Sequence, residues 1–436
     1  VKQTYVNIKL RKEVRMKITS LTPEQQEVVQ HNNGLQVYLK NLQSGRDSTP
    51  RSWLYEDRDP MEVVRTWIKD YLEPYKKYGL HGDLVYQFDT SKLKKCVPQG
   101  AVPPISEIMD IVLAGYNQAG SPKPAIYSSP EWQRAKENAI KYLINDTGIY
   151  HTLRPRAYEH VVDDMRSRDT LESNSGWPDF SRRNDPAVLA SAYNAIKTGV
   201  YKTYPAIVLF RNYKAKTRMV WMYPLASNIV EGSFTQPLKE ALMQSDLNFI
   251  APWRGYDHVL NRISKLYDAG EFLSASDFSH TDEFFTKWDT LEVFDVIKHA
   301  FQPQYWDDLK ESMLHVNSIP LVVGTNRIIY GDHGVSSGSN WTNDVETYYD
   351  FIFEQYFTIL KYVKEPAFAI GDDVAHRRDT YLKQLAALIA AGYKKANKDV
   401  NEAKVTNEPD YVIILQRLTI RGFKSDRTFI DNKGVP

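Results

Sequence analysis

Aspartate residues stand at two places where the sequence predicts that a β-strand ends. Asp277 closes a segment of small and apolar residues, and Asp282 follows five residues later. Gly371-Asp372-Asp373 lies between two apolar segments, which predicts a hairpin with two carboxylates at its turn. Carboxylates on adjacent strands can bridge two Mg²⁺ ions about 4 Å apart, an arrangement that activates a hydroxyl and neutralises a leaving pyrophosphate. These residues therefore point to phosphoryl transfer.

Each segment also has a purely structural explanation. An Asp-rich turn needs no function, and acids near the start of a helix gain from the helix dipole, with Ser279 or Thr281 available as a cap. The pairing of the strand end with the Asp-Asp turn favours the metal site, because Mg²⁺ needs hard oxygen ligands and no His or Cys.

A basic cluster precedes the first acidic strand. Arg211, Lys214, Lys216 and Arg218 place four cations within eight residues that include no acid. Apolar segments on both sides predict two strands joined by a basic loop. A solvated surface loop is the alternative, but a triphosphate needs such cations to hold it and to screen the leaving group.

A glycine- and serine-rich loop over residues 334–343 leads into a helix predicted over Thr342–Leu360. Exposed amides and hydroxyls at a helix entrance can contact phosphate and ribose, and Ser337, Gly338, Thr342 and Asn343 are the candidates. Flexible surface loops often have the same composition, so the loop alone decides nothing.

The order of elements predicts an α+β fold. Helices are expected over 131–145, from the Asp185-Pro186 cap, and over 282–301, 342–360 and 379–391, the last ending at Gly392. Strands are expected within 204–224, 271–277 and 411–420, with the hairpin at 367–375. An antiparallel sheet with helices on one face would bury the apolar residues and leave the Asp-bearing strand ends open.

Composition and sequence features indicate the class of protein and its compartment. The 55 Lys and Arg residues nearly balance 54 Asp and Glu, so net charge alone does not indicate nucleic acid. The single cysteine, Cys96, excludes an internal disulfide and a thiolate metal cluster, which favours a reducing compartment. No signal peptide or membrane-spanning run is recognised, so we expect a soluble protein.

Over about 173–420, the order of these segments resembles the motifs of viral RNA-dependent RNA polymerases. In chain order, motif G resembles Ser175-Gly176-Trp177-Pro178, motif F resembles 214–218, and motif A resembles Asp277 with Asp282. Motif B resembles Ser337-Gly338 with Thr342, motif C resembles Gly371-Asp372-Asp373, and motif E resembles Leu415-Gln416-Arg417. Lys398 is similar to the motif D lysine that acts as a general acid toward pyrophosphate, with Lys394 and Lys395 as competing matches.

The resemblance implies roles for these residues. Catalysis falls to Asp277, Asp372, Asp373 and Lys398, and the three aspartates would bind two Mg²⁺ ions, with Mn²⁺ as a substitute. The nucleotide would be bound by Arg211, Lys214, Lys216, Arg218, Asp282, Ser337, Gly338, Thr342 and Asn343, and template or primer by Ser175, Gly176, Pro178, Gln416 and Arg417. The resemblance implies RNA template and product, ribonucleoside triphosphates and the viral capsid as partners, and no membrane. It also implies that the enzyme is located in the host cytoplasm and works inside the virion.

The family's right-hand architecture implies fingers, palm and a short or truncated thumb. We expect an N-terminal region and fingers with motifs G and F over 1–265, palm with motif A over 266–300, a fingers insertion over 301–333, palm with motifs B, C and D over 334–405, and motif E with the start of the thumb over 406–436.

One departure from the family's motif pattern indicates which group of viral polymerases the chain resembles most. Glu346 stands where many positive-strand virus enzymes have Asn four residues after the motif B Thr, which resembles small double-stranded RNA viruses, picobirnaviruses first and partitiviruses second. Because two nearby acids repel, we expect Thr342 or Asn343 to orient Asp282, with Glu346 turned toward a basic partner or protonated. A reverse transcriptase, or a non-catalytic RNA-binding or capsid-associated protein with a degenerate palm, is the rival interpretation.

Overall fold

The computed structural model describes residues 16–47, 58–93, 98–213, 216–278, 281–364, 366–400 and 405–422. Cys96 and Lys214 lie outside these ranges, as do the side chains of Tyr213, Asp277 and Pro366. The described part combines many helices with three small sheets, as the predicted α+β order requires. None of its helices is both long and apolar enough to span a membrane.

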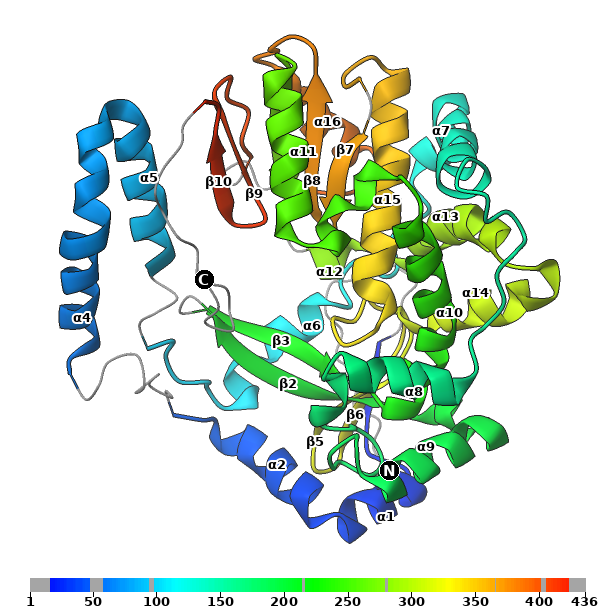
Figure 1. Cartoon of the computed structure of the whole chain (residues 1–436). Coiled ribbons are helices and arrows are strands. Elements are labelled where there is room, and N and C mark those ends of the chain that lie inside the picture. Colours follow the sequence, from blue (N-terminus) through cyan, green and yellow to red (C-terminus); the bar gives the residue numbers. More distant parts are fainter. Residues whose placement is uncertain are drawn as a thin grey trace.

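A five-stranded sheet forms the lower part of the molecule in Figure 1, with strand order β1-β6-β5-β2-β3. Its strands are β1 Lys17–Thr19, β2 Ala206–Tyr213, β3 Lys216–Met222, β5 Leu321–Gly324 and β6 Arg327–Tyr330. Only the β2–β5 pairing is parallel within this sheet. The predicted pair of strands around the basic cluster is confirmed as β2 and β3.

Both faces of this sheet are covered because its strands are apolar on both sides. Ile207 of β2 packs with Leu35 and Leu39 of helix α2 (Asn33–Ser44) on one face. Its neighbour Val208 packs with Val112 of α6 (Met109–Ala114) on the other face. Successive strand residues point to opposite faces, so the two clusters alternate along β2. Further N-terminal helices are α1 Pro23–His31, α4 Pro60–Trp67 and α5 Gly79–Lys92.

A three-stranded antiparallel sheet, β4-β8-β7, carries the predicted aspartates. Its strands are β4 Phe272–Asp277, β7 Pro366–Ile370 and β8 Asp373–Arg378. Helices cover both of its faces and not one face as predicted: α15 (Trp341–Ile359) packs on one, and α11 (Tyr256–Asp268) on the other (Figure 1). The reason is that Val374 and Ala375, which point to opposite faces of β8, are both apolar and buried.

Helix α15 is the centre of the largest core. Nearly all of its residues from Trp341 to Phe357 are buried, and it packs against α7 (Pro130–Ile140) and α13 (Lys287–Ile297). Trp132 of α7 is fully buried there. Helices α10 (Leu225–Gln244) and α14 (Trp306–His315) also contribute to this core, whereas α8 (Tyr158–Ser167) and α9 (Pro186–Thr198) pack with the start of α10 in a separate cluster. The predicted Asp185 cap of α9 is confirmed, because its carboxylate accepts from Ala187 N.

Three predicted elements differ in the structure. The helix expected over 282–301 is broken into α12 (Thr281–Phe284) and α13, because Thr286 and Asp289 form a capping box that starts a new helix. The expected strand over 411–420 is a hairpin of β9 (Tyr411–Ile414) and β10 (Arg417–Ile420). Its two turn residues, Leu415 and Gln416, have φ of 53° and 57°, as a two-residue type I′ turn requires.

The third difference concerns the helix expected over 379–391. Helix α16 spans Leu385–Lys394, so it starts later and continues through Gly392. A Cβ at Gly392 would lie 2.3 Å from the ring of Phe357. This glycine therefore allows α16 to approach α15 closely and does not end the helix.

Candidate active site

The predicted aspartates converge at one end of the three-stranded sheet. Asp277 is paired with Asp373 in the register of β4 and β8, and Asp372 occupies the turn between β7 and β8. The Thr281 hydroxyl donates to Asp372 Oδ2 at 2.7 Å, so α12 holds the turn from the β4 side. The backbone of the strands therefore brings these three positions together.

Gly371 allows the turn to lie against α15. Its φ of 56° is in the left-handed region, and a Cβ there would lie 2.8 Å from Asn343 Nδ2. The Gly371 N–H donates to Thr347 Oγ1 at 2.8 Å. Helix α15 therefore fixes the position of the turn, and a larger residue at 371 would push Asn343 away.

Several carboxyl groups crowd this end of the sheet. Desolvation by the surrounding protein raises the pKa of Asp282 to about 7, the charges of Asp372 and Glu283 add to the rise, and the charge of Arg218 opposes it. Water reaches the Asp282 side chain, so part of this effect is screened. Burial, followed by the charges of Asp282 and Asp372, raises the pKa of Glu346 well above its ordinary value. Carboxyl groups that repel one another in this way are typical of sites that bind cations.

The basic cluster lies on the strands and not only in the loop between them. Arg211 of β2 is paired with Arg218 of β3, and residues directly opposite in an antiparallel pair share one face. Arg211, Lys216 and Arg218 are exposed. Arg218 is close enough to Asp282 to lower its pKa, which brings the basic face next to the acidic group. Lys214, the fourth predicted cation, lies outside the described residues.

The glycine- and serine-rich loop is held in place by hydrogen bonds, in contrast to the flexible alternative, and up to the start of α15 it is buried except at the exposed residues Ser337 and Asn340 and at partly buried Gly338. Ser336 donates to Val316 O at 2.8 Å, and the Ser337 hydroxyl accepts from Trp221 N at 3.4 Å. A Cβ on Gly338 would lie 1.8 Å from Trp221 O. Glycine at 338 is therefore needed for the loop to cross β3.

A buried carboxylate on α10 holds the rest of this loop, and the sequence analysis did not identify it. Glu231 accepts hydrogen bonds from Ser339 Oγ at 2.6 Å, Asn340 N at 2.8 Å and Asn228 Nδ2 at 3.1 Å. Burial raises the pKa of Glu231 to about 7, although these hydrogen bonds and the Arg183 charge oppose the shift. No local pattern marks this residue, because the two loop residues that it holds, Ser339 and Asn340, lie more than 100 positions away.

The segment similar to motif G packs against the start of α10. Ser175 is buried, and its carbonyl accepts from Leu225 N at 2.9 Å. Gly176 has φ of 67°, and a Cβ there would lie 2.5 Å from Tyr223 O. Pro178 follows Trp177 through a cis peptide bond. Arg183 connects this segment to α10 by donating to Asn228 Oδ1 at 2.8 Å.

The structure separates the two predicted partners of Asp282. The Thr342 hydroxyl donates its single proton to Ser336 O at 2.7 Å, so it is not available to Asp282, and that part of the prediction is wrong. Asn343 is exposed on the otherwise buried start of α15 and lies beside Gly371. The raised pKa of Glu346 favours its protonated form, the second of the predicted alternatives.

Lys398 occupies a different environment from the one its predicted role requires. Its side chain is 2% exposed, and Nζ donates to Asp289 Oδ2 and Phe284 O at 2.7 Å and to Ala396 O at 3.4 Å. Burial lowers the pKa of Lys398, and Asp289 opposes that effect. All three N–H groups have acceptors, so in this structure Lys398 stabilises the core and has no donor for a phosphate. Lys394 and Lys395 are exposed.

The residues similar to motif E lie on the hairpin of β9 and β10. Gln416 is in its turn, and Arg417 begins β10 with its guanidinium 3.9 Å from the ring centre of Tyr256. The hairpin packs on the face of the three-stranded sheet that α11 covers. It is therefore attached to the acidic strands from the side opposite α15.

A second unpredicted group lies behind the acidic strands. Ser276 Oγ is 2.8 Å from His376 Nε2, and the other ring nitrogen of His376 is hydrogen-bonded to Glu354 of α15. All three side chains are buried. This chain of contacts connects β4, β8 and α15 within three residues of Asp277 and Asp373 along the two strands.

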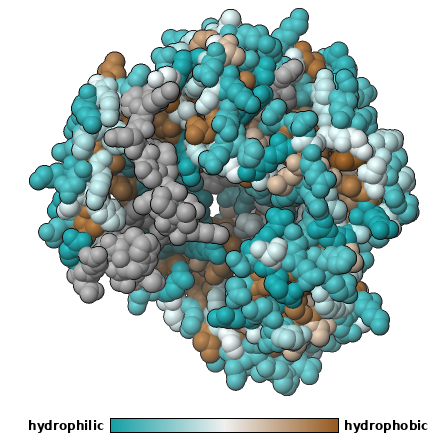
Figure 2. All heavy atoms as spheres, in the orientation of Figure 1, coloured by the Kyte–Doolittle hydropathy of each residue, from teal (hydrophilic) through white to brown (hydrophobic). Residues whose placement is uncertain are grey.

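The site faces an open centre. Figure 2, in the orientation of Figure 1, shows that the molecule is hollowed near its middle, where Figure 1 places β3 and α12 on the border. Hydrophilic residues predominate on the visible surface around this hollow. The hollow is therefore next to β3, which carries Arg218, and α12, which carries Asp282.

Comparisons with known proteins agree with this geometry. Residues 200–413 match the family model described as viral RNA-dependent RNA polymerase. A protein of Human picobirnavirus (strain Human/Thailand/Hy005102/-), named "Potential RNA-dependent RNA polymerase", is 25% identical over 341 residues, which are 72% of this chain and 59% of that protein. The chain thus spans about three-fifths of the length of this relative.

Two solved structures share the fold. The RNA-dependent RNA polymerase of a human picobirnavirus has a TM-score of 0.75 and 21% identity, with 93% of this chain and 78% of that chain covered. Its insertion loop deletion mutant has a TM-score of 0.74 and 22% identity, with coverage of 93% and 81%. Residues 200–413 therefore match the viral RNA-dependent RNA polymerase family, and the chain has the fold of a picobirnavirus polymerase, as the order of its sequence motifs predicted.

Proposed function

We propose that the chain is an RNA-directed RNA polymerase that copies an RNA template from ribonucleoside triphosphates, for replication and transcription of a viral genome. The observation that carries the proposal is the register that pairs Asp277 with Asp373 beside Asp372. Arg218 lies close enough to act on Asp282 at the same site. Paired acids next to a basic face match a reaction in which a triphosphate meets metal-bound carboxylates.

The donor set fits a divalent cation. Asp277, Asp372 and Asp373 offer hard oxygens, and the repulsion among neighbouring carboxyl groups shows an excess of negative charge. We assign these three residues to two Mg²⁺ ions, with Mn²⁺ as a substitute. When bound, such ions lower the pKa of the attacking hydroxyl and neutralise the leaving pyrophosphate. Thr281 orients Asp372 for this role by donating to its Oδ2.

The remaining side chains would position the substrates. Exposed Arg211, Lys216 and Arg218 would bind the incoming triphosphate and offset the charge that grows on the leaving group. Asp282 and Asn343 would contact the ribose, where the 2′ hydroxyl both donates and accepts. The loop with Ser337, Gly338 and Thr342 would support the nucleotide. Ser175, Gly176 and Pro178 would support the template, and Gln416 with Arg417 would support the primer.

The same assignment gives the architecture of a right hand. We infer fingers over 1–265 with an insertion at 301–333, palm over 266–300 and 334–405, and the start of a short thumb over 406–436. The β4-β8-β7 sheet supports the palm assignment, and the exposed cations of β2 and β3 support the fingers. A cytoplasmic enzyme that works inside the viral capsid would agree with this role.

Incorporation of labelled nucleotides on a primed RNA template tests the function. Asp372→Asn should reduce incorporation about 100-fold or more, because a metal ligand is lost, while exposed Asp257→Asn should leave it unchanged. The thermal transition of Asp372→Asn should stay the same or rise, since one of several like charges is removed. Preference for deoxyribonucleotides would identify a reverse transcriptase, and full activity of Asp372→Asn would contradict the site.

A further inference from the structure

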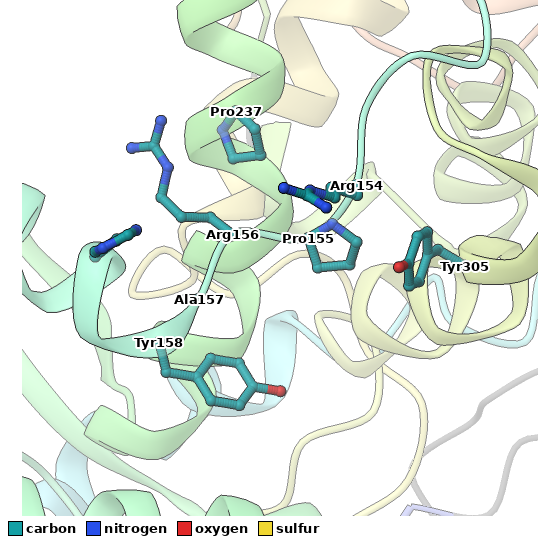
Figure 3. Close-up of a pocket in the computed structure, with 8 residues that line it drawn as sticks. Arg154, Pro155, Arg156, Ala157, Tyr158, Pro237 and Tyr305 are labelled. Atoms are coloured by element: carbon teal, nitrogen blue, oxygen red, sulfur yellow. The ribbon is translucent and has the colours of Figure 1, made fainter.

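A separate pocket of about 660 Å³ opens where the segment before α8 meets α10. Figure 3 shows Arg154, Pro155 and Tyr305 gathered together, with Tyr158 below them and Pro237 of α10 above. None of the residues assigned above to catalysis or nucleotide binding lines it. Its volume is within the usual range for small-molecule sites.

A proline inside α10 builds one wall of this pocket. Pro237 has no N–H, so the carbonyl of Ser233 one turn earlier lacks its usual helical donor. Arg156 N supplies the missing hydrogen bond to Ser233 O at 2.8 Å. The chain that carries Arg154 and Tyr158 is therefore attached to α10 at a defined place.

The two arginines of this segment have different environments. Arg156 is held by α10, because its guanidinium donates to Gln236 and forms an ion pair with Glu240. Arg154 is exposed, and within the described part of the chain no hydrogen bond or ion pair of its side chain is found. His160 is also exposed at the pocket. Arg154 and His160 can thus contact an anion without breaking an existing interaction.

Aromatic rings accompany these cations. Tyr158 is 36% exposed, and Tyr305 also borders the pocket, beside Pro155 in Figure 3. Earlier in the same segment, Tyr150 is 50% exposed and stacked on His151, with ring centres 3.9 Å apart. Exposed rings that alternate with basic residues are the features on which proteins bind single-stranded nucleic acid, by base stacking and phosphate contacts.

The charged side chains indicate how a nucleotide would be oriented in the pocket. No Asp or Glu is among the described residues that line it, and Arg154, Arg156 and His160 make the lining basic. Asp308 acts on the Tyr158 hydroxyl from outside the pocket and disfavours a phosphate there. A phosphate therefore fits the Arg154 end, and an uncharged base fits against Tyr158 and Tyr305.

We propose that this pocket binds a nucleotide of a single-stranded RNA segment outside the catalytic site, with its phosphate on Arg154 and its base on the tyrosines. The choice of RNA as occupant rests on the proposed polymerase function. Pro237 lies six residues after Glu231, roughly 9 Å along α10, so the helix that holds the glycine- and serine-rich loop also borders the pocket. RNA bound there would lie on the outer side of that helix.

Crosslinking and binding test this proposal in the full-length chain. The probe is a labelled single-stranded RNA of about 20 nucleotides with photoreactive uridines, long enough for more than one site. Wild type should crosslink at Tyr158 or Tyr305. The double variant Arg154→Ala, Tyr158→Ala should lose this crosslink and bind the RNA roughly tenfold more weakly, since one stacking and one phosphate contact are removed. Both side chains are exposed, so its thermal transition should not change.

The matched control is Arg65→Ala, Tyr71→Ala, which removes the same residue types from exposed positions near α4. It should retain the wild-type affinity and crosslinks. Unchanged affinity and crosslinks in the pocket variant would overturn the proposal, as would displacement of the RNA by an equal concentration of AMP. Incorporation of nucleotides on a short primed template is measured in parallel. Absence of incorporation in wild type would contradict the polymerase function, whereas the crosslink at the tyrosines tests only whether the pocket binds RNA.

Discussion

Replacement of Glu231 tests whether the glycine- and serine-rich loop is held in place by the hydrogen bonds of this side chain or by its charge. In Glu231→Gln, a carbonyl oxygen at the Oε2 position keeps the hydrogen bonds from Asn340 N and Asn228 Nδ2. The new NH₂ group then faces the Ser339 hydroxyl, which can accept as well as donate. Glu231→Ala instead leaves three donors without an acceptor, at about 1–3 kcal/mol each. The two variants should therefore behave differently.

The pH dependence follows from the raised pKa of Glu231, about 7 in the folded protein against an ordinary value of 4.5. Between these values the folded state binds more protons than the unfolded state, so this group lowers the free energy of unfolding as pH rises. This loss of unfolding free energy is absent at pH values well below 4.5 and complete at pH values well above 7. The difference between them corresponds to about 3 kcal/mol.

Urea titrations of wild type and Glu231→Gln at about pH 4.5 and about pH 8 measure this contribution. The free energy of unfolding of the variant, relative to wild type, should rise by about 3 kcal/mol between the two conditions. The variant should keep most of its nucleotide incorporation. Glu231→Ala should be less stable and less active, because the loop loses its anchor. An equal difference between wild type and Glu231→Gln at both pH values would refute the reasoning.

Three further substitutions test the loop, the basic face and the ribose contact. Gly338→Ala should reduce incorporation and lower the unfolding free energy by about 1–3 kcal/mol, since its Cβ would collide with a backbone oxygen 1.8 Å away; thermal unfolding measures the loss. Arg218→Ala should reduce kcat/KM for the nucleotide about tenfold or more, and an effect on template affinity alone would assign it to RNA. Asn343→Ala should reduce kcat/KM for ribonucleotides more than for deoxyribonucleotides, whereas Thr342→Ala should reduce both equally; a changed ratio in Thr342→Ala alone would reverse the assignment.

Local patterns in the sequence were sufficient for the elements that carry the aspartates. The turn at Gly371 and the strand ending at Asp277 are short segments whose periodicity and turn residues lie within a few positions. Lys398 and Glu231 could not be assigned in the same way. The roles of these two side chains depend on partners such as Asp289 and Asn340, which lie more than 100 positions away and become neighbours only through the fold.

Helix α15 shows why an apolar pattern can conceal a functional face. Glu346, Asp350 and Glu354 recur every four residues, which places them on one side of a helix that is buried on almost all sides. Each has an oxygen without a hydrogen-bond partner, and burial together with neighbouring carboxylates raises the pKa of both Glu346 and Asp350. Apolar residues at these positions would pack at lower cost. Glu346 and Asp350 are close enough to the turn for the Asp372 charge to contribute to both pKa shifts, whereas Glu354 is hydrogen-bonded to His376, so the burial of α15 and the electrostatics of the site are parts of one arrangement. A cation bound at the strand ends would relieve the same repulsion that this stripe of acids creates, and the stability of the helix core is in this way linked to occupation of the site.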